Sequence, residues 1–161
     1  MSVKLQKHIT SHWDEIEQAR VDTLIFMKSN GYDENISDAI IMVISELLEN
    51  AVKYGVFTAA NEGIDYSIEV HKEAIIVEVI NPYDTVALDN FKKMDKIIQW
   101  IRGYQNPFQA YIEKLKEISG RSLEDRESGL GLVRIAYQGR SIVDFYLRND
   151  SRISVSAVYQ I

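Results

Sequence analysis

The sequence predicts an α+β protein built as a two-layer α/β sandwich, in which one mostly antiparallel sheet carries helices on one face. Strand patterns and helix patterns occur in groups along the chain and do not strictly alternate, which is typical of this class. One long helix pattern, IIMVISELLENAVKYG at residues 40–55, places its apolar residues on one side. That helix supplies the apolar face which the second layer has to cover.

The first 55 residues predict one strand and two helices. Residues 3–9 form a short strand pattern. Thr10 or Ser11 can cap a first helix, which ends at 30–31, where Asn-Gly is a common C-terminal stop. Asn35 or Ser37 can cap the second helix, whose pattern runs to Gly55. We therefore expect a strand followed by two helices before the sheet proper begins.

The rest of the chain predicts four further strands and three helices. Apolar and polar residues alternate over 66–70 and 75–79, which indicates two strands that each have one face on a core. Pro82 ends the second of them. Helical patterns follow over 88–101, 108–118 and 129–138, and the last two strands are expected over 142–147 and 153–159.

Composition restricts the class of protein. The 161 residues predict a single domain over 1–161, with 46% hydrophobic and 26% charged residues, as in soluble proteins. A net charge of −6 argues against nucleic acid as a general partner. The absence of cysteine excludes disulfides, thiolate catalysis and zinc–sulfur sites. No stretch is apolar enough for a membrane span or a signal peptide, so we expect a cytoplasmic protein without a membrane partner.

The central helix carries a polar stripe opposite its apolar side. Glu46, Asn50 and Lys53 follow one another at i, i+4 and i+7. Such a row is ordinary on a solvated helix face, where Glu and Lys neighbours modestly stabilise a helix. If other elements cover both sides of the helix, the same row lies in a cleft and can bind a ligand.

The order of residues in this stretch resembles a known motif. ELLENAVKY at residues 46–54 is similar to the N-box of the Bergerat-type ATPases, which join gyrase, Hsp90, histidine kinases and MutL with the anti-sigma serine kinases. The resemblance implies that Glu46 is the general base and that Asn50 holds magnesium. It also implies that Lys53 lies at the nucleotide site.

A second motif begins the helix expected after residue 128. Gly129 and Gly131 each cost a helix about 1 kcal/mol relative to alanine, so close backbone contact is expected there. Tight packing against a neighbour would explain them, and so would phosphate at the helix N-terminus. SGLGLVRIAY resembles the glycine box that ends the ATP lid in histidine kinases and anti-sigma kinases. The resemblance implies that Gly129, Leu130, Gly131 and Leu132 hold phosphate.

The chain departs from the family at the end of its second central strand. There the family carries D-x-G-x-G, whose aspartate accepts the adenine amino group. Asn81 stands in place of the aspartate and Tyr83 in place of the first glycine. The resemblance therefore implies that Asn81 contacts the adenine, while the ring of Tyr83 stands where the family leaves room for it.

Residues 84–128 correspond to the lid of the family. They contain equal numbers of basic and acidic residues and two amphipathic helix patterns. Trp100, Tyr104, Phe108 and Tyr111 suit either burial against the domain, which is the more ordinary outcome, or the anchoring of a partner, since aromatic residues are enriched at interface cores.

These features imply one function and leave a second open. A stand-alone domain of this kind most resembles the bacterial anti-sigma-type serine/threonine kinases, which use ATP and Mg²⁺ to phosphorylate a small antagonist protein in partner switching. A homodimer is a further expectation. The alternative is a non-catalytic interaction module that kept the fold and lost productive ATP binding. Glu46 and Asn50 favour the kinase, whereas Asn81 and Tyr83 favour the module.

Overall fold

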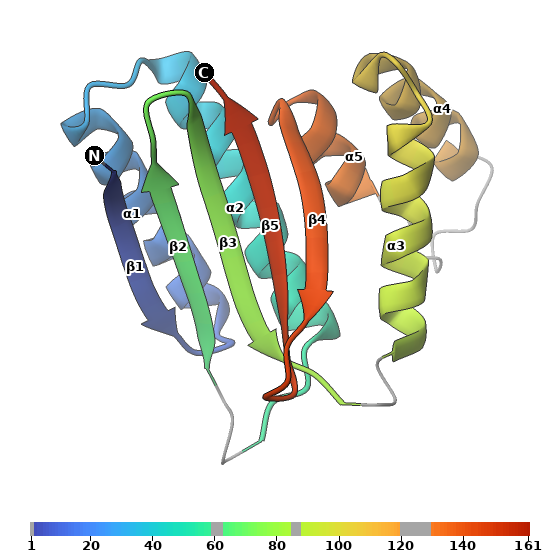
Figure 1. The fold of residues 1–161 in the computed structure, drawn as a ribbon, viewed down its shortest axis with the longest axis horizontal. Coiled ribbons are helices and arrows are strands. Elements are labelled where there is room, and N and C mark those ends of the chain that lie inside the picture. The colour runs from blue at the N-terminus through green and yellow to red at the C-terminus, as the bar shows by residue number, and fades with distance from the viewer. Residues whose placement is uncertain (1, 59–62, 85–87, 120–129) are drawn as a thin grey trace.

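The computed structural model describes residues 2–58, 63–84, 88–119 and 130–161. Its described part has two layers, with a five-stranded sheet in front and helices behind it (Figure 1). The predicted α+β sandwich is therefore confirmed. Along the chain the elements are β1 (Val3–Ile9), α1 (Trp13–Ser29), α2 (Glu34–Tyr54), β2 (Ile64–Val70), β3 (Ala74–Pro82), α3 (Leu88–Arg102), α4 (Pro107–Ser119), α5 (Leu130–Tyr137), β4 (Ser141–Leu147) and β5 (Arg152–Gln160).

The sheet has the strand order β1-β2-β3-β5-β4, and each neighbouring pair is antiparallel. In the centre of the sheet, Val77 of β3 stands opposite Ile68 of β2 and Ala157 of β5. All three side chains are buried on the face that the helices cover. The strand alternation seen in the sequence therefore sets which residues enter the core.

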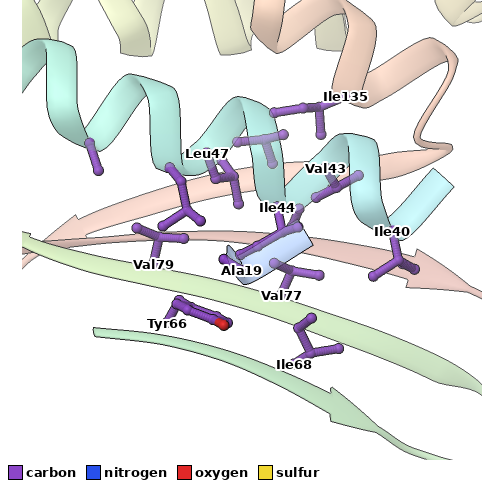
Figure 2. Close-up of a cluster of buried hydrophobic side chains, with 14 of the residues drawn as sticks. Ala19, Ile40, Val43, Ile44, Leu47, Tyr66, Ile68, Val77, Val79 and Ile135 are labelled. Atoms are coloured by element: carbon purple, nitrogen blue, oxygen red, sulfur yellow. The ribbon is translucent and has the colours of Figure 1, made fainter. Parts of the chain in front are cut away.

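The apolar side of α2 forms the middle of the core. Figure 2 shows Ile40, Val43, Ile44 and Leu47 in one buried cluster with side chains of β2, β3 and α5. The predicted apolar residues are all buried, with exposed fractions of 4% or less: Ile40, Ile44, Leu47, Leu48 and Ala51. Among the described residues, no helix is both long and apolar enough to cross a membrane.

The helices α3 and α4 lie beyond the outer edge of the sheet, next to α5 and β4 (Figure 1). Arg102, at the end of α3, donates from Nη2 to the carbonyl oxygen of Val143 at 3.0 Å. Its guanidinium also lies 3.7 Å from the carboxylate of Asp144. Because an edge strand leaves backbone groups unpaired, this contact partly covers the edge that β4 would otherwise expose.

The predicted helix caps were wrong in detail. The cap of α2 is Asp33, whose carboxylate accepts a hydrogen bond from the Ile36 amide at 2.9 Å. Helix α1 begins after His12, which makes no side-chain cap, and Thr10 instead donates from its amide to the Glu15 carboxylate at 2.8 Å. Several cap-type residues occur in each stretch, so the pattern alone does not select one of them.

Candidate functional site

The polar row of α2 does not stay together in the structure. Glu46 and Asn50 are half-buried, and the side chain of Glu46 keeps an exposed fraction of only 14%. Lys53 is exposed at the end of the helix, where its Nζ lies 5.0 Å from the centre of the Tyr54 ring. The candidate site is therefore formed around Glu46 and Asn50, and Lys53 lies outside its buried part.

Helix α5 covers Glu46. Arg134 donates from Nη1 to Oε1 of Glu46 at 2.8 Å. The other carboxylate oxygen lies so close to Gly131 that a Cβ on this residue would stand 2.6 Å from it. A side chain at position 131 would thus displace the carboxylate, and this contact explains why glycine occupies the second position of the helix.

Burial governs the titration of this carboxyl group. Burial raises the pKa of Glu46 above its ordinary value, Arg134 lowers it, and the nearby charge of Glu49 raises it again, so that the net shift is upward. A partly buried carboxyl group whose pKa is raised is a candidate for proton transfer, and structural ion pairs shift pKa values too.

One turn further along α2, Asn50 lines a small cavity between α2, β3, α3 and β5. Its other lining residues are Leu47, Ala51, Tyr54, Asn81, Phe91, Met94, Ile153 and Val155. The cavity measures about 20 Å³, which is room for roughly one water molecule. A nucleotide base therefore does not fit here while α3 lies in this position.

The residues expected at the adenine site are packed against neighbouring groups of the protein. Asn81 is buried, with an exposed fraction of 3%, and its Nδ2 donates to the carbonyl oxygen of Pro82 at 3.0 Å. The ring of Tyr83 packs edge-on against Phe91, with 5.3 Å between the ring centres. Phe91 comes from α3, so this helix closes the cavity from outside.

The donors near Asn50 fit a magnesium ion only as part of a larger set. Mg²⁺ takes oxygen ligands and usually keeps waters or phosphate oxygens among them. Asn50 offers a carboxamide oxygen, and Glu46 offers a carboxylate one helical turn away. Across the described residues, no group of three or more His, Asp or Glu side chains could hold a metal by itself. Asn50 thus suits one ligand position beside phosphate.

The aromatic residues of α3 and α4 pack mainly within the domain. Trp100 meets Tyr104 with 4.9 Å between ring centres, and the Nζ of the buried Lys114 lies 4.9 Å from the Trp100 ring. Tyr111 stacks on Tyr137 of α5 at 5.2 Å. Phe108 also meets Tyr137 and remains 44% exposed.

Two residues of the site were not predicted from the sequence. Arg134 stands three positions after Gly131, so helical spacing places both on one side of α5, and that spacing could have indicated the contact. Phe91 gave no such signal, because an amphipathic helix does not reveal which cavity its apolar side closes. Gly129 and the charged stretch 121–128 lie outside the described residues, whereas Leu130 and Leu132 lie in the first turn of α5.

Comparisons with known proteins find the fold and no sequence relative. No family model matches the chain, and no curated protein sequence does. Among solved structures, one chain of the SiaB–SiaC complex from Pseudomonas aeruginosa is similar, with a TM-score of 0.71 and 18% identity. The match covers 98% of this chain and 89% of that one.

A second solved structure is similar over part of a longer chain. It contains the RsbU and RsbW domains of Rv1364c from Mycobacterium tuberculosis, with a TM-score of 0.57 and 13% identity. The match covers 98% of this chain and 32% of the other. At these identities the likenesses concern the fold alone, and they confirm the Bergerat-type fold that the N-box and glycine-box resemblances implied.

Proposed function

We propose that this chain is a regulatory protein of the partner-switching type, which acts on a small antagonist-type protein as an ATP-dependent serine/threonine kinase. The fold supports this, since similar chains occur in a complex of two named proteins, SiaB and SiaC, and in a chain with an RsbW domain. The observation that carries the proposal is the position of Glu46, a half-buried carboxylate with a raised pKa beside the N-terminal turn of α5.

In this proposal the chain's own residues divide the work. Glu46 takes the proton from the acceptor hydroxyl of the partner, and Arg134 orients its carboxylate through the 2.8 Å contact. The amides of α5 at Leu130 to Leu132 bind phosphate, because a helix N-terminus carries unpaired N–H groups and a positive dipole end. Asn50 contributes one oxygen to Mg²⁺, which would neutralise phosphate charge.

Nucleotide binding requires α3 to move in this proposal. Phe91 and Met94 line the small cavity next to Asn50 and Asn81, where the base would have to enter. Opening the cavity separates Phe91 from Tyr83 and from the buried Ile153. Binding is then weakened by the free energy of opening, since only the open fraction of the protein is competent.

The second candidate is the non-catalytic interaction module. The closed cavity favours it, because Phe91 and Tyr83 occupy the space near Asn81 with apolar contacts of their own. In that case Glu46 and Arg134 form a structural ion pair between α2 and α5, and partner binding alone is the function.

One experiment separates the two candidates. Phosphate transfer from labelled ATP to a co-purifying small protein is measured with the wild type, Glu46→Gln and Asn50→Ala. The kinase predicts labelled serine or threonine with the wild type only, while Glu46→Gln still binds nucleotide. Labelling that is equally fast with Glu46→Gln would remove this residue from the role of base. Complete absence of labelling, together with stable partner binding, would establish the interaction module.

A further inference from the structure

A second and much larger cavity lies on the other side of α3. It measures about 440 Å³, within the range of about 300–1,000 Å³ that is usual for small-molecule sites. Its walls come from α3, the start of α4, α5 and the start of β4. The apolar part of the lining consists mainly of Ile98, Ile101, Leu132, Ala136, Ile142 and Val143.

A strained arginine stands at this cavity. Arg140 lies in the tight turn between α5 and β4, where the amide of Gly139 donates back to the carbonyl of Arg134 at 3.0 Å. The backbone of Arg140 has φ +46°, in the left-handed region that favours glycine or asparagine. An unfavourable backbone geometry with a charged side chain at a cavity is a reason to look for a function there.

The positive charge of Arg140 is not balanced by the described residues. Within 2–58, 63–84, 88–119 and 130–161, its side chain makes no hydrogen bond and no ion pair. The other guanidinium at the cavity belongs to Arg102, which already contacts the Val143 carbonyl and the Asp144 carboxylate. Ser141 is also engaged, because its hydroxyl donates to the Gly139 carbonyl at 2.8 Å. Among the described residues, the exposed Arg140 therefore has no partner for its positive charge, and it stands next to an apolar space.

We propose that this cavity binds a small amphipathic monocarboxylate, with its apolar body between α3 and α5 and its carboxylate on Arg140. A guanidinium binds a carboxylate through two parallel hydrogen bonds, and one unpaired guanidinium balances one negative charge. The apolar body gains from burial against Ile98, Ile101 and Leu132. The proposal does not depend on the kinase function. Neither Glu46 nor Asn50 lines this cavity, and Leu132, which does, has only its backbone amide in the kinase proposal.

The test uses decanoate as the probe and decan-1-ol as its neutral match, both titrated by calorimetry into the full chain. Decanoate should bind at one site. Arg140→Gly removes the guanidinium while giving the strained backbone a residue that tolerates it, so the variant should fold at least as well. It should bind decanoate about tenfold more weakly, as expected for a lost charged hydrogen bond, and decan-1-ol unchanged.

Two further variants locate the ligand. Ala136→Met fills part of the cavity and should weaken binding of decanoate and decan-1-ol alike, whereas Arg20→Ala, on the exposed surface of α1, should change neither. The proposal fails if decanoate does not saturate a site below millimolar concentration, or if Arg140→Gly and Ala136→Met bind it like the wild type. It also fails if sedimentation shows that Ala136→Met breaks a dimer, which would assign the cavity to a second copy of the chain.

Discussion

The carboxylate of Glu46 lies 2.8 Å from the guanidinium of Arg134, across the interface between α2 and α5. The same carboxylate fills the space beside Gly131, where a Cβ would stand 2.6 Å from Oε2, so one acidic side chain lies against two residues of the glycine-containing helix. Both contacts join the N-box stretch to the glycine-box stretch, which are far apart in the sequence. The pair therefore fixes where the first turn of α5 stands relative to α2.

The contact between Glu46 and Gly131 predicts a coupling between the two positions. In a Glu46→Ala background, Gly131→Ala should raise the free energy of unfolding by about 1 kcal/mol, because alanine is the better helix former. In the wild-type background the gain should be smaller or reversed, since the new Cβ pushes the carboxylate away from Arg134. Urea unfolding of the four proteins measures this coupling. An equal effect of Gly131→Ala in both backgrounds would show that the contact is absent in solution.

The raised pKa of Glu46 predicts a specific dependence of stability on pH. The ordinary value is 4.5, and the folded value lies above it. Below 4.5 the carboxyl is protonated in the folded and unfolded states, and its contribution to stability is fully present. The contribution is lost as the pH rises through the folded pKa, because the unfolded chain ionises more easily.

The measurement compares wild type with Glu46→Gln by urea unfolding between pH 4 and pH 8. The wild type should lose stability relative to the glutamine variant as the pH rises above 4.5, and the difference should level off above the folded pKa. Arg134→Gln should enlarge the effect, since Arg134 lowers the pKa of Glu46. A pH-independent difference would mean that the carboxyl is solvated.

Much of the fold could be predicted from the sequence because period-two and helical patterns each report one buried face. The seam of α2 is an example, since every apolar residue expected there is buried. The Bergerat-type fold could also be predicted from the sequence, because two short motifs at a characteristic separation indicated it. The caps of α1 and α2 were not, because neighbouring Thr, Ser, Asp and Asn residues all qualify as caps.

The site was harder to predict than the fold, since its state depends on long-range packing. The sequence pattern placed Glu46 and Asn50 together, and they do lie on one half-buried side of α2. It could not show that Phe91 of α3 would close the space next to Asn50, because nothing local in α3 specifies its partner. The pairing of Glu46 with Arg134 was also a tertiary outcome, although helical spacing had put Arg134 next to Gly131.

The hydrogen bond of Asn81 predicts how its substitutions behave. Its amide donates to the Pro82 carbonyl inside the core, and the Val56 amide donates to the same carbonyl. Asn81→Leu should therefore cost about 0.5–1.5 kcal/mol of stability, as for the loss of one hydrogen bond whose acceptor keeps another donor. Asn81→Asp should cost at least as much at neutral pH and less at low pH, where a protonated carboxyl can donate. The exposed Asn149→Asp, in the β4–β5 turn, serves as the control and should stay within about 0.5 kcal/mol. Thermal and urea unfolding at pH 4 and 7 measure these differences in stability. If Asn81→Asp is as stable as the wild type at both pH values, the assigned hydrogen bond is contradicted.

Substitutions of two aromatic residues in the α3–α4 region should show which ring stabilises the fold and which ring serves partner docking. Trp100→Ala removes contacts with Tyr104 and Lys114, so we expect a loss of roughly 1–3 kcal/mol in the free energy of unfolding. Phe108→Ala, at a ring that is 44% exposed, should cost about 1 kcal/mol or less, and under the proposed function it should weaken capture of the small partner protein. Partner capture that survives Phe108→Ala unchanged would place the docking surface elsewhere.

The most direct test of nucleotide use is a thermal melt of wild type and Asn50→Ala with millimolar ATP or ADP, in the presence and absence of Mg²⁺. A ligand at 100 times its dissociation constant stabilises the folded state by about 2.7 kcal/mol, which a melt readily resolves. The kinase proposal predicts that nucleotide raises the melting temperature of the wild type more with Mg²⁺ than without it. In Asn50→Ala, adding Mg²⁺ should not change the effect of the nucleotide. An unchanged melting temperature of the wild type under all of these conditions would contradict it.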